Sequence, residues 1–415
     1  MSITTTTSHT AITKRLFRAT FALCLASIVV FANLYATQPL LPLLAESFSV
    51  TQAQTLQSLT LTTLMLAISL LIYGPVSDIW GRKVVMLSSF IGMCITTLAL
   101  SLIDNFEQLL WLRAIHGFFL GGLPATAIAY IGEEFPRTRI AATVGLYISA
   151  NSIGGIGGRI LSGAISDWWD WQAVFVILTV CNLAAMILLA LLLPKSSEFQ
   201  RYRFKLNRLL NPLTHLQNRT LLVAFLIGGS NFMIVLTLYS YLTFLLAEPP
   251  YSLSPSWLGL LFLTYIAGSL SSALTSYFNH SFSCAQQIIL GTCLILIGTL
   301  CTLQGHLGLI ILGLLVNGFG FFLAHSNLST WVNQYAQHSK ASASSLYLVF
   351  YYLGASIGNS YLNPFWIWWG WAGVVLGGIL VIALSLLGGF YLYGDEKSNR
   401  IKPNNTADNT NHCEQ

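Results

Sequence analysis

The stretch Gly74-Pro75-Val76-Ser77-Asp78-Ile79-Trp80-Gly81-Arg82-Lys83 separates two long apolar segments, residues 52–77 and 84–103. Each segment is long enough to cross a bilayer as a helix. Asp78 stands where the first helix would end, Gly81 supplies a tight turn, and Arg82 and Lys83 begin the next helix. Such a charged hairpin can bind the ends of neighbouring helices. The stretch therefore predicts two membrane helices joined at one surface of the bilayer.

The composition of the whole chain excludes a soluble protein. Of its 415 residues, 55% are hydrophobic and only 8% are charged, whereas about 25% of the residues of a soluble domain are charged. Disorder is excluded too, because disordered segments combine low hydrophobicity with high net charge. The apolar excess is expected to contact lipid, so the bilayer is the first predicted partner.

Twelve apolar segments have the length of a transmembrane helix, which is about 20 residues. We therefore expect an all-α membrane protein with twelve transmembrane helices. The predicted spans are residues 17–44, 52–77, 84–103, 107–132, 141–165, 171–193, 220–247, 256–278, 286–304, 307–335, 343–366 and 371–393.

The positive charges mark one side of the membrane. Lys14, Arg15 and Arg18 lie before or at the start of the first span, and cytoplasmic segments are enriched in Lys and Arg. Later Lys and Arg residues follow spans two, four, six and ten and lie in the C-terminal tail, while the loops on the other side contain no Lys or Arg. Both termini are therefore predicted to be cytoplasmic. This orientation accounts for the net charge of +5, and no nucleic acid partner is expected.

The longest polar interruption, residues 195–219, follows the sixth span and contains six positive charges and one negative charge. It divides the spans into two groups of six. The predicted domains are a cytoplasmic N-terminal tail (1–16), a six-helix bundle (17–194), a basic cytoplasmic linker (195–219), a second six-helix bundle (220–393) and a cytoplasmic C-terminal tail (394–415).

The two groups of six spans contain an internal repeat. A shift of 200 residues superimposes Gly154 on Gly354 and Gly158 on Gly358. Rare tryptophans that coincide at the same shift make chance agreement improbable, so we expect two pseudo-symmetric bundles. The tryptophans are Trp168, Trp169 and Trp171 in the first copy and Trp368, Trp369 and Trp371 in the second.

Two similar bundles that face each other suit alternating access, in which one bundle rocks against the other around a central site. The repeat therefore predicts a carrier, and a channel is the alternative outside carriers. An enzyme is not expected, because the sequence has no clustered metal ligands, nucleophile elbow or phosphate-binding loop. We expect a monomer that binds a small-molecule solute and carries no metal or cofactor.

The hairpin resembles the G-x-x-x-D-x-x-G-R-[RK] signature of the major facilitator superfamily. The resemblance implies a cytoplasmic gate in which Asp78 caps a helix of the other half. Arg82 would pair with Glu134 or Glu133 at the end of the fourth span, and Arg139 would be a further partner. The expected gate residues are Gly74, Asp78, Gly81, Arg82, Lys83, Glu133, Glu134 and Arg139.

Further motifs resemble the same family. Arg113-Ala114-Ile115-His116-Gly117 is similar to its R-x-x-Q-G element, and the run 154–158, followed by Arg159, is similar to its antiporter motif without the usual proline. Within the family the chain most resembles the YnfM-like branch, on residues 35–42, 146–163, 324–326 and 343–347. The resemblance implies proton-linked efflux of a small organic solute across the bacterial inner membrane. Proton-driven or facilitated uptake of a sugar or organic acid is the alternative.

The sequence also offers candidates for the proton and substrate pathway. All fourteen acidic residues lie in predicted loops, tails or span ends, so the histidines of spans four and ten are the candidate proton carriers. Simple hydrogen bonding to a neighbouring helix is the alternative role for them. Two intramembrane arginines need either an anionic or hydroxyl-rich substrate or an acid that reaches in, namely Glu46, Asp104, Glu107 or Asp167. The candidate residues are Asn33, Tyr35, Gln38, Arg113, His116, Asn151, Arg159, Asn231, Tyr239, Asn317, His325 and Asn327.

Overall fold

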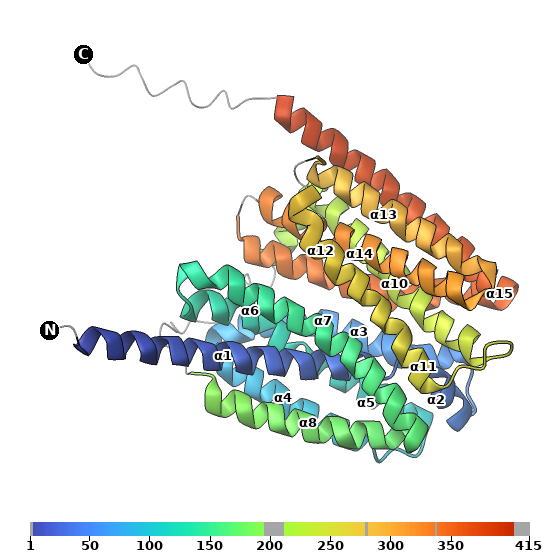
Figure 1. The fold of residues 1–415 in the computed structure, drawn as a ribbon, viewed down its shortest axis with the longest axis horizontal. Helices are drawn as coiled ribbons and strands as arrows, with labels where there is room; N and C mark the ends of the chain where they lie inside the picture. The colour runs from blue at the N-terminus through green and yellow to red at the C-terminus, as the bar shows by residue number, and fades with distance from the viewer. Residues whose placement is uncertain (1–2, 195–210, 279–280, 337, 402–415) are drawn as a thin grey trace.

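The computed structural model describes residues 3–194, 211–278, 281–336 and 338–401, and every regular element in these ranges is a helix (Figure 1). Eleven helical segments are long and apolar enough to cross a membrane. The last of them, Lys340–Ser398, contains Gly370 with φ 56° and ψ −137°, which divides it into two consecutive spans. The described residues therefore hold twelve crossings, and the predicted fold class is confirmed.

The helices before residue 195 form the first six spans. They are α1 (Ile3–Tyr35), α2 (Leu41–Ser47), α3 (Gln52–Trp80), α4 (Arg82–Leu100), α5 (Phe106–Leu120), α6 (Gly122–Glu134), α7 (Arg137–Trp168) and α8 (Trp171–Leu192). The remaining elements form the other six spans and their connections. They are η1 (Asn211–Gln217), α10 (Arg219–Ala247), α11 (Pro255–Leu260), η2 (Leu261–Thr264), α12 (Tyr265–Phe278), α13 (Cys284–Cys301), η3 (Thr302–Gln304), α14 (Leu307–Tyr335) and α15 (Lys340–Ile401).

Side-chain caps fix where several spans begin. Thr51 Oγ1 accepts a hydrogen bond from the backbone N–H of Gln54, and Gln54 Oε1 accepts one from the N–H of Thr51, which is a capping box at the start of α3. Ser283 and Gln286 form the same box at the start of α13. These bonds satisfy backbone N–H groups that have no partner within the helix.

The repeated glycines pack in the same way in both halves. A Cβ on Gly154 of α7 would lie 2.3 Å from the carbonyl oxygen of Ile28 in α1, and a Cβ on Gly354 of α15 would lie 2.1 Å from that of Gly229 in α10. Only a residue without a side chain allows two helix backbones to approach this closely. The first and fifth spans therefore pack like the seventh and eleventh, and the predicted pseudo-symmetry is present in the packing.

The predicted first span, residues 17–44, consists of two helices. α1 begins at Ile3, so it extends through most of the segment expected as a tail, and it ends at Tyr35. Residues 36–40 form turns before α2 begins at Leu41. Pro39 explains the interruption because proline lacks an N–H group and disfavours a helical conformation of the residue before it. Gln38 consequently lies outside regular helix.

Other boundaries also differ from the expected ones. Span four is divided at Gly121 into α5 and α6, and span eight consists of α11, η2 and α12. α15 continues to Ile401, beyond the predicted boundary at 393. Residues 195–210 of the basic linker and residues 402–415 of the tail lie outside the described residues. Residues 279–280, in the connection between α12 and α13, lie outside them as well.

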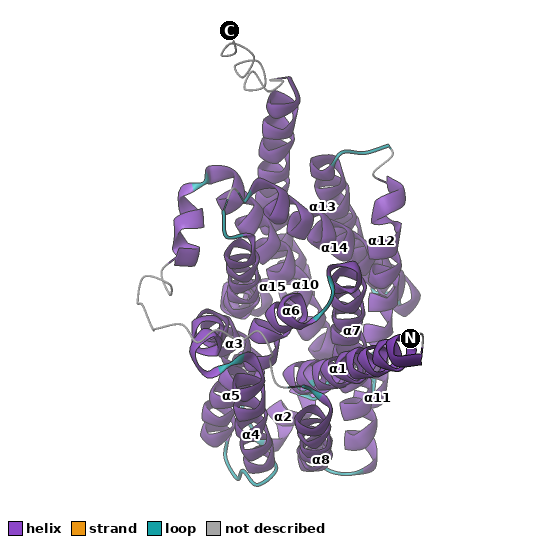
Figure 2. Ribbon diagram, turned by 90° about the vertical axis from the view of Figure 1, so that its left-hand side faces the viewer, coloured by secondary structure: helices purple, strands orange, loops and turns teal. Residues whose placement is uncertain are grey.

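The two halves lie side by side, with the helices of the first half in the lower part of Figure 1 and those of the second half above them, except for the short α11, which is drawn at the level of α2. α1 begins at the left of this view and the C-terminal part of α15, drawn in red, runs from the right toward the upper left, and we call the left side the termini end. α2 and α11 lie on the other side, which we call the opposite end. Figure 2 views the helices from the termini end and shows the same division into lower and upper groups.

Candidate functional site

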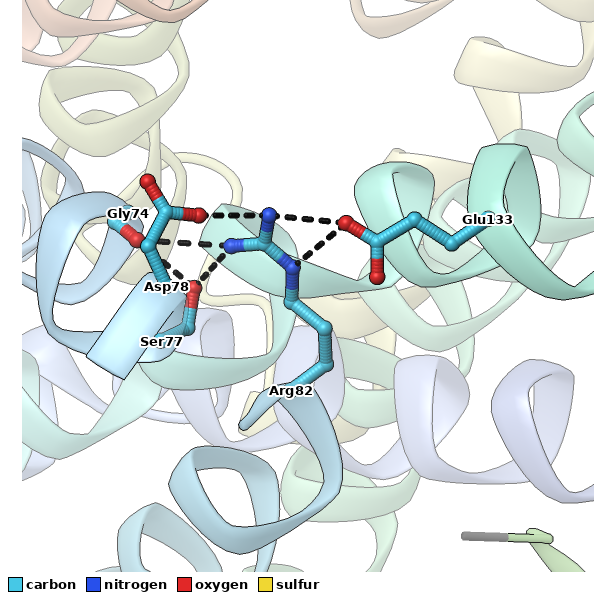
Figure 3. Close-up of polar contacts among 5 residues, drawn as sticks. All are labelled: Gly74, Ser77, Asp78, Arg82 and Glu133. Carbon is cyan, nitrogen blue, oxygen red and sulfur yellow. Dashed lines mark hydrogen bonds and ion pairs between the residues drawn. The ribbon is translucent and has the colours of Figure 1, made fainter. Parts of the chain in front are cut away.

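Arg82 is the centre of an ionic cluster at the termini end (Figure 3). Its Nη2 lies 2.6 Å from Asp78 Oδ1 and 2.9 Å from Glu133 Oε1. Its Nη1 donates to the carbonyl oxygen of Gly74 at 3.4 Å and to the hydroxyl of Ser77. Bonds from two edges of one guanidinium fix its orientation. The cluster ties the turn between α3 and α4 to the end of α6, within the first half.

The two glycines of the hairpin have different environments. Gly81 joins α3 to α4 by itself, and its φ of 94° lies in the region that favours glycine. A Cβ on Gly74 would have no atom within 4 Å. The structure therefore explains glycine at position 81 by backbone conformation and gives no steric requirement for it at position 74.

The acids at the end of α6 have separate partners. Of the two acids expected for Arg82, Glu133 forms the pair, whereas Glu134 Oε2 lies 3.5 Å from Arg15 Nη2. Arg139, expected as a further partner, is exposed at the start of α7 and forms no ion pair with another described residue.

Lys83 binds the end of another helix. Its Nζ donates to the carbonyl oxygens of Ala190, at 2.7 Å, and of Leu193. A cation at the last turn of a helix compensates carbonyl groups that have no N–H partner. Lys83 therefore links the signature hairpin to the end of α8, which is the last span of the first half.

At the opposite end an acid of the first half caps a helix of the second. Asp167 Oδ2 accepts hydrogen bonds from Ser254 Oγ at 2.7 Å and from the backbone N–H of Ser256 at 3.2 Å. The resemblance led us to expect such a cap from Asp78. In this state Asp78 instead pairs with Arg82 in its own hairpin.

Further polar contacts join the halves on the side of α3. Asn359 Nδ2 of α15 donates to Thr60 Oγ1 at 2.8 Å and to the carbonyl oxygen of Leu56 at 3.4 Å. Trp366 Nε1 donates to Gln52 Oε1 at the first residue of α3. Because these bonds lie in the N-terminal part of α3, which points toward the opposite end, the two bundles are held together at that end.

Arg113 is fully buried inside the first half. Its Nη1 donates to the carbonyl oxygen of Asn33 at 3.3 Å, and its Nη2 donates to the carbonyl oxygen of Leu34 at 3.1 Å and to Thr37 Oγ1 at 3.2 Å. None of these partners is an acid. The charge of Arg113 is therefore solvated by neutral oxygens at the end of α1.

His116 uses both ring nitrogens in the same polar cluster. Its Nδ1 lies 3.2 Å from Arg113 Nη1, and an arginine can only donate, so Nδ1 is the acceptor and the proton of the neutral ring lies on Nε2. Nε2 lies 3.2 Å from Thr97 Oγ1, which in turn bonds to Asn33 and Asn182. This arrangement fits the interpretation that His116 hydrogen-bonds neighbouring helices.

Arg159 lies where the two halves meet. Its side chain is buried, with 2% of its surface exposed. Nε donates to Gln38 Oε1 at 2.8 Å, and Nη1 donates to the carbonyl oxygen of Gly155 at 2.9 Å. Gln38 Nε2 donates across to α10, to Ser240 Oγ at 2.9 Å and to the carbonyl oxygen of Leu236 at 3.2 Å. Gln38 thus connects Arg159 to the second half.

Three aromatic rings contact the Arg159 guanidinium. Its Cζ lies 3.9 Å from the ring centroid of Tyr35, 4.3 Å from that of Phe262 and 5.4 Å from that of Tyr265. The first ring belongs to α1, and the other two belong to η2 and α12 of the second half. Such cation–π contacts are worth about 2 kcal/mol when the cation is desolvated. They partly offset the cost of burying this charge.

His325 lies in an aromatic cluster of the second half. Its Nδ1 lies 2.7 Å from the hydroxyl of Tyr347. The centroid of its ring lies 4.9 Å from that of Tyr351 and 5.9 Å from that of Phe321. No hydrogen bond to another described residue involves Nε2. His325 therefore keeps one ring nitrogen available, whereas His116 does not.

The other predicted pathway residues form hydrogen bonds between helices of the same half. In this state these bonds hold the helices of each bundle together. Asn151 pairs with Ser27, Asn231 with Thr292, Tyr239 with Thr264, Asn317 with Thr299 and Asn327 with Gln287.

Sequence reasoning missed several of the residues that complete these sites. Phe262 and Tyr265 carry no motif, and only the fold brings them onto a cation about 100 positions away in the chain. Asn182 gave a usable signal, because a lone asparagine stands in the apolar run of span six. Asp167 carries no sequence signal for its capping role and is expected from the sequence only as an acid that reaches in toward the arginines.

Acidic groups do not complete either buried arginine. Every described Asp or Glu lies at a helix end or in a connection, and the candidate acid Asp167 is bonded to Ser254. Within the described ranges no group of three or more His, Cys, Asp or Glu residues is placed to hold a metal ion.

The same arrangement is found in known proteins. A bacterial homologue of the human lysosomal transporter Spinster, solved in an inward-facing and unoccupied conformation, superimposes with a TM-score of 0.74 at 15% sequence identity, covering 92% of this chain and 98% of that one. At this identity the similarity concerns the fold.

Two proteins are similar in sequence over most of their length. YybF of Bacillus subtilis, an uncharacterized MFS-type transporter, is 37% identical over 89% of this chain and 93% of its own. The inner membrane transport protein YnfM of Escherichia coli is 36% identical over 92% of each chain. The family profile described as Major Facilitator Superfamily matches residues 23–359. The chain is thus a multi-pass membrane transporter and not an enzyme, and it belongs to the Major Facilitator Superfamily.

Proposed function

We propose that this chain carries a small organic solute across the bacterial inner membrane by alternating access, with residues 17–194 and 220–393 as the two moving bundles. The observation that carries the proposal is the asymmetry of the polar contacts. At the opposite end, Asp167 and Asn359 bond across the two halves. At the termini end, the three ion pairs between described residues all lie within the first half. A carrier that alternates closes one end at a time.

The orientation of this state follows from the distribution of Lys and Arg. With both termini in the cytoplasm, the opposite end faces the periplasm, and the structure corresponds to a state closed toward the periplasm. The cytoplasmic gate of Asp78 and Arg82 would then engage the second half only in the alternative state. The pair between Arg82 and Glu133 holds the hairpin ready for that contact.

We further propose proton-linked export, in which His325 carries the proton. His325 has a ring nitrogen without a described partner, and the Tyr347 hydroxyl can accept or donate as the ring changes its protonation. His116 is a poorer carrier because a proton on Nδ1 would face the Arg113 guanidinium at 3.2 Å. The outward direction rests on the similarity of the glycine-rich run of span five to antiporters, and uptake is the alternative direction.

The test begins with growth inhibition by a panel of toxic organic compounds, with and without overexpression of the chain. A compound against which overexpression protects is then used in proteoliposomes. We expect counterflow, in which unlabelled solute on one side drives uptake of label from the other, and a pH gradient that drives accumulation. Flux without counterflow would indicate a channel and contradict the proposal.

Three variants test the parts of the mechanism, the last of them as a control. Cysteines at Gln52 and Trp366, in a background without native cysteines, should be joined by a short reducible bifunctional cross-linker that abolishes transport until the linker is reduced, because the two side chains meet in this state, with the opposite end closed. His325→Gln should retain counterflow and lose pH-driven accumulation. His116→Gln, which keeps an acceptor for Arg113, should retain both activities.

A further inference from the structure

Arg159 carries a positive charge that no acid among the described residues compensates. Its side chain is 2% exposed, and both of its hydrogen-bond acceptors, Gln38 Oε1 and the carbonyl oxygen of Gly155, are neutral. An arginine at the centre of a membrane span costs about 2.5 to 3.5 kcal/mol even on insertion scales. A cation kept at such a cost, where the two halves meet, is well placed to bind an anion that the protein itself does not supply.

The guanidinium also has a free edge. Its Nε and Nη1 donate to the protein, but no hydrogen bond to a described residue involves Nη2. A second donor stands beside it. Tyr265, whose ring contacts the same guanidinium, is 8% exposed, and its buried hydroxyl has no hydrogen-bond partner. An unpaired buried hydroxyl is unfavourable, and a carboxylate between these two donors would satisfy both of them.

The surroundings of these donors are aromatic. Tyr265 contacts Phe322 with ring centroids 5.9 Å apart, and Phe322 contacts Phe321 at 5.3 Å. The series continues through Tyr351, which stacks on Phe232 with centroids 3.7 Å apart and planes 11° apart. The anion site thus adjoins a continuous layer of rings from the second half. Rings of this kind suit a flat apolar body through stacking and edge contacts.

We propose that Arg159 and Tyr265 bind the carboxylate of a monovalent organic anion whose aromatic or flat apolar body packs on the adjoining rings. One uncompensated cation at the site matches one negative charge, because Arg113 lies apart in the first bundle and is bonded to its own carbonyl groups. The inference rests on the proposed function insofar as it makes this anion the transported solute.

The site requires both halves. Arg159, Tyr35 and Gln38 come from the first half, whereas Phe262 and Tyr265 come from the second. An anion on Nη2 leaves the bond between Nε and Gln38 in place, and Gln38 remains bonded to α10. The anion would therefore bind the state with the opposite end closed and stabilise it.

The experiment measures binding to the purified full chain in lipid nanodiscs by isothermal titration calorimetry. The probes are benzoate, phenylacetate and 1-naphthoate, each compared with its neutral amide, and chloride at matched ionic strength. We expect at least one carboxylate to bind at least tenfold more tightly than its amide and to raise the unfolding temperature, while chloride has no such effect.

Variants locate the binding. Arg159→Gln should weaken the carboxylate at least tenfold, Arg159→Lys should weaken it less, and Tyr265→Phe should weaken it threefold to tenfold. Tyr147→Phe is the matched control, because it removes another buried hydroxyl about 18 Å farther along the same helix as Arg159, and it should bind within twofold of the native chain. Tyr265→Phe keeps the test informative if Arg159→Gln fails to fold.

The inference is overturned if no carboxylate binds better than its amide or if chloride raises the unfolding temperature as much as the carboxylates do. It is also overturned if Arg159→Lys and Tyr265→Phe bind the carboxylate like the native chain. Its failure can be told from failure of the carrier role, because binding needs no transport. If the chain catalyses counterflow of a neutral solute and aromatic carboxylates do not inhibit this counterflow, the anion site is disproved and the carrier role stands. If a carboxylate binds in a way that depends on Arg159 but the chain shows no counterflow, the anion site stands and the carrier role is disproved.

Discussion

Asp167 Oδ2 accepts a hydrogen bond from Ser254 Oγ at 2.7 Å, so the last turn of α7 in the first half caps the start of α11 in the second. The resemblance implied such a cap at the signature hairpin. In this state it is formed instead by a different acid at the opposite end. Because the bond joins the two halves, its strength sets part of the energy needed to open that end.

Asp167→Ala should shift the equilibrium toward the state open at the opposite end. Loss of a capping or charge-assisted hydrogen bond costs about 1 to 2 kcal/mol, which corresponds to a factor of about ten in the populations. Spin labels at the exposed residues Ser47 and Trp368 would measure the distance between the two halves at the opposite end. The shift should appear as a larger population of long distances between the two labels. Asp170→Ala, three positions along, is the control, because Asp170 forms no side-chain cap on α8. Equal distance distributions in both variants would contradict the role of Asp167.

The pair between Arg82 and Glu133 should contribute measurably to the stability of the hairpin. The two side chains are 13% and 35% exposed, so screening limits their coupling to about 1 kcal/mol. A double-mutant cycle of Arg82→Gln and Glu133→Gln, measured by denaturation in mixed micelles, should show this non-additivity. Arg139→Gln should leave stability unchanged and add independently to both. Coupling of Arg139 to Glu133 as strong as that of Arg82 would favour the pairing that the structure does not show.

The glycine contacts separate packing from helix propensity. Gly154→Ala and Gly354→Ala each place a methyl group 2.1 to 2.3 Å from a carbonyl oxygen of the neighbouring helix, which forces the backbones apart. We expect losses of about 1 to 3 kcal/mol, as for overpacking in a core. Gly157→Ala, in the same run, meets no atom within 4 Å and should be neutral or slightly stabilising, since alanine favours a helix. Thermal unfolding in detergent distinguishes these outcomes, and equal losses at Gly154 and Gly157 would disprove the packing role.

The sequence is sufficient to predict most of the fold because apolar length, charge distribution and an internal repeat can be read along the chain without knowing how the helices pack. The spans follow from such patterns, whereas the pairing of Arg82 with an acid at the end of span four was implied by the resemblance of the hairpin to the family signature. The choice of Glu133 over Glu134 does not, because the two are adjacent and only the orientation of α6 separates them.

The site at Arg159 shows where such reasoning ends. The sequence identifies the cation and the absence of an acid near it. Its aromatic contacts with Phe262 and Tyr265 depend on how the eighth span crosses the fifth, and apolar periodicity contains no information on that crossing. Similarly, the sequence shows only that Asn33 and Asn317 are polar residues in spans. Their hydrogen bonds, from Asn33 to Asn182 and from Asn317 to Thr299, place one inside the first bundle and the other inside the second, and periodicity does not predict these partners.

The linker that joins the halves should respond to mild acid. His215 of η1 stacks on His338, with ring centroids 4.9 Å apart and planes 21° apart. Burial, with a smaller contribution from the His338 ring, lowers the pKa of His215 from its ordinary value. When η1 is docked, with His215 stacked on His338, the His215 ring therefore binds a proton less readily than when η1 is detached. Docking of η1 is unaffected at a pH well above the ordinary histidine pKa of about 6.5, and it weakens as the pH falls below that pKa.

We therefore expect the hydrogen-exchange protection factors of η1 amides to fall several-fold between about pH 7.5 and about pH 5.5, on either side of that value. His215→Gln should abolish this difference, because glutamine does not titrate. His306→Gln is the control, since His306 is exposed at the opposite end, and this variant should keep the full response. If η1 were protected equally at both pH values in the native chain, the stacked pair would be a packing contact with no pH sensitivity, and the linker would hold the halves in the same way at any physiological pH.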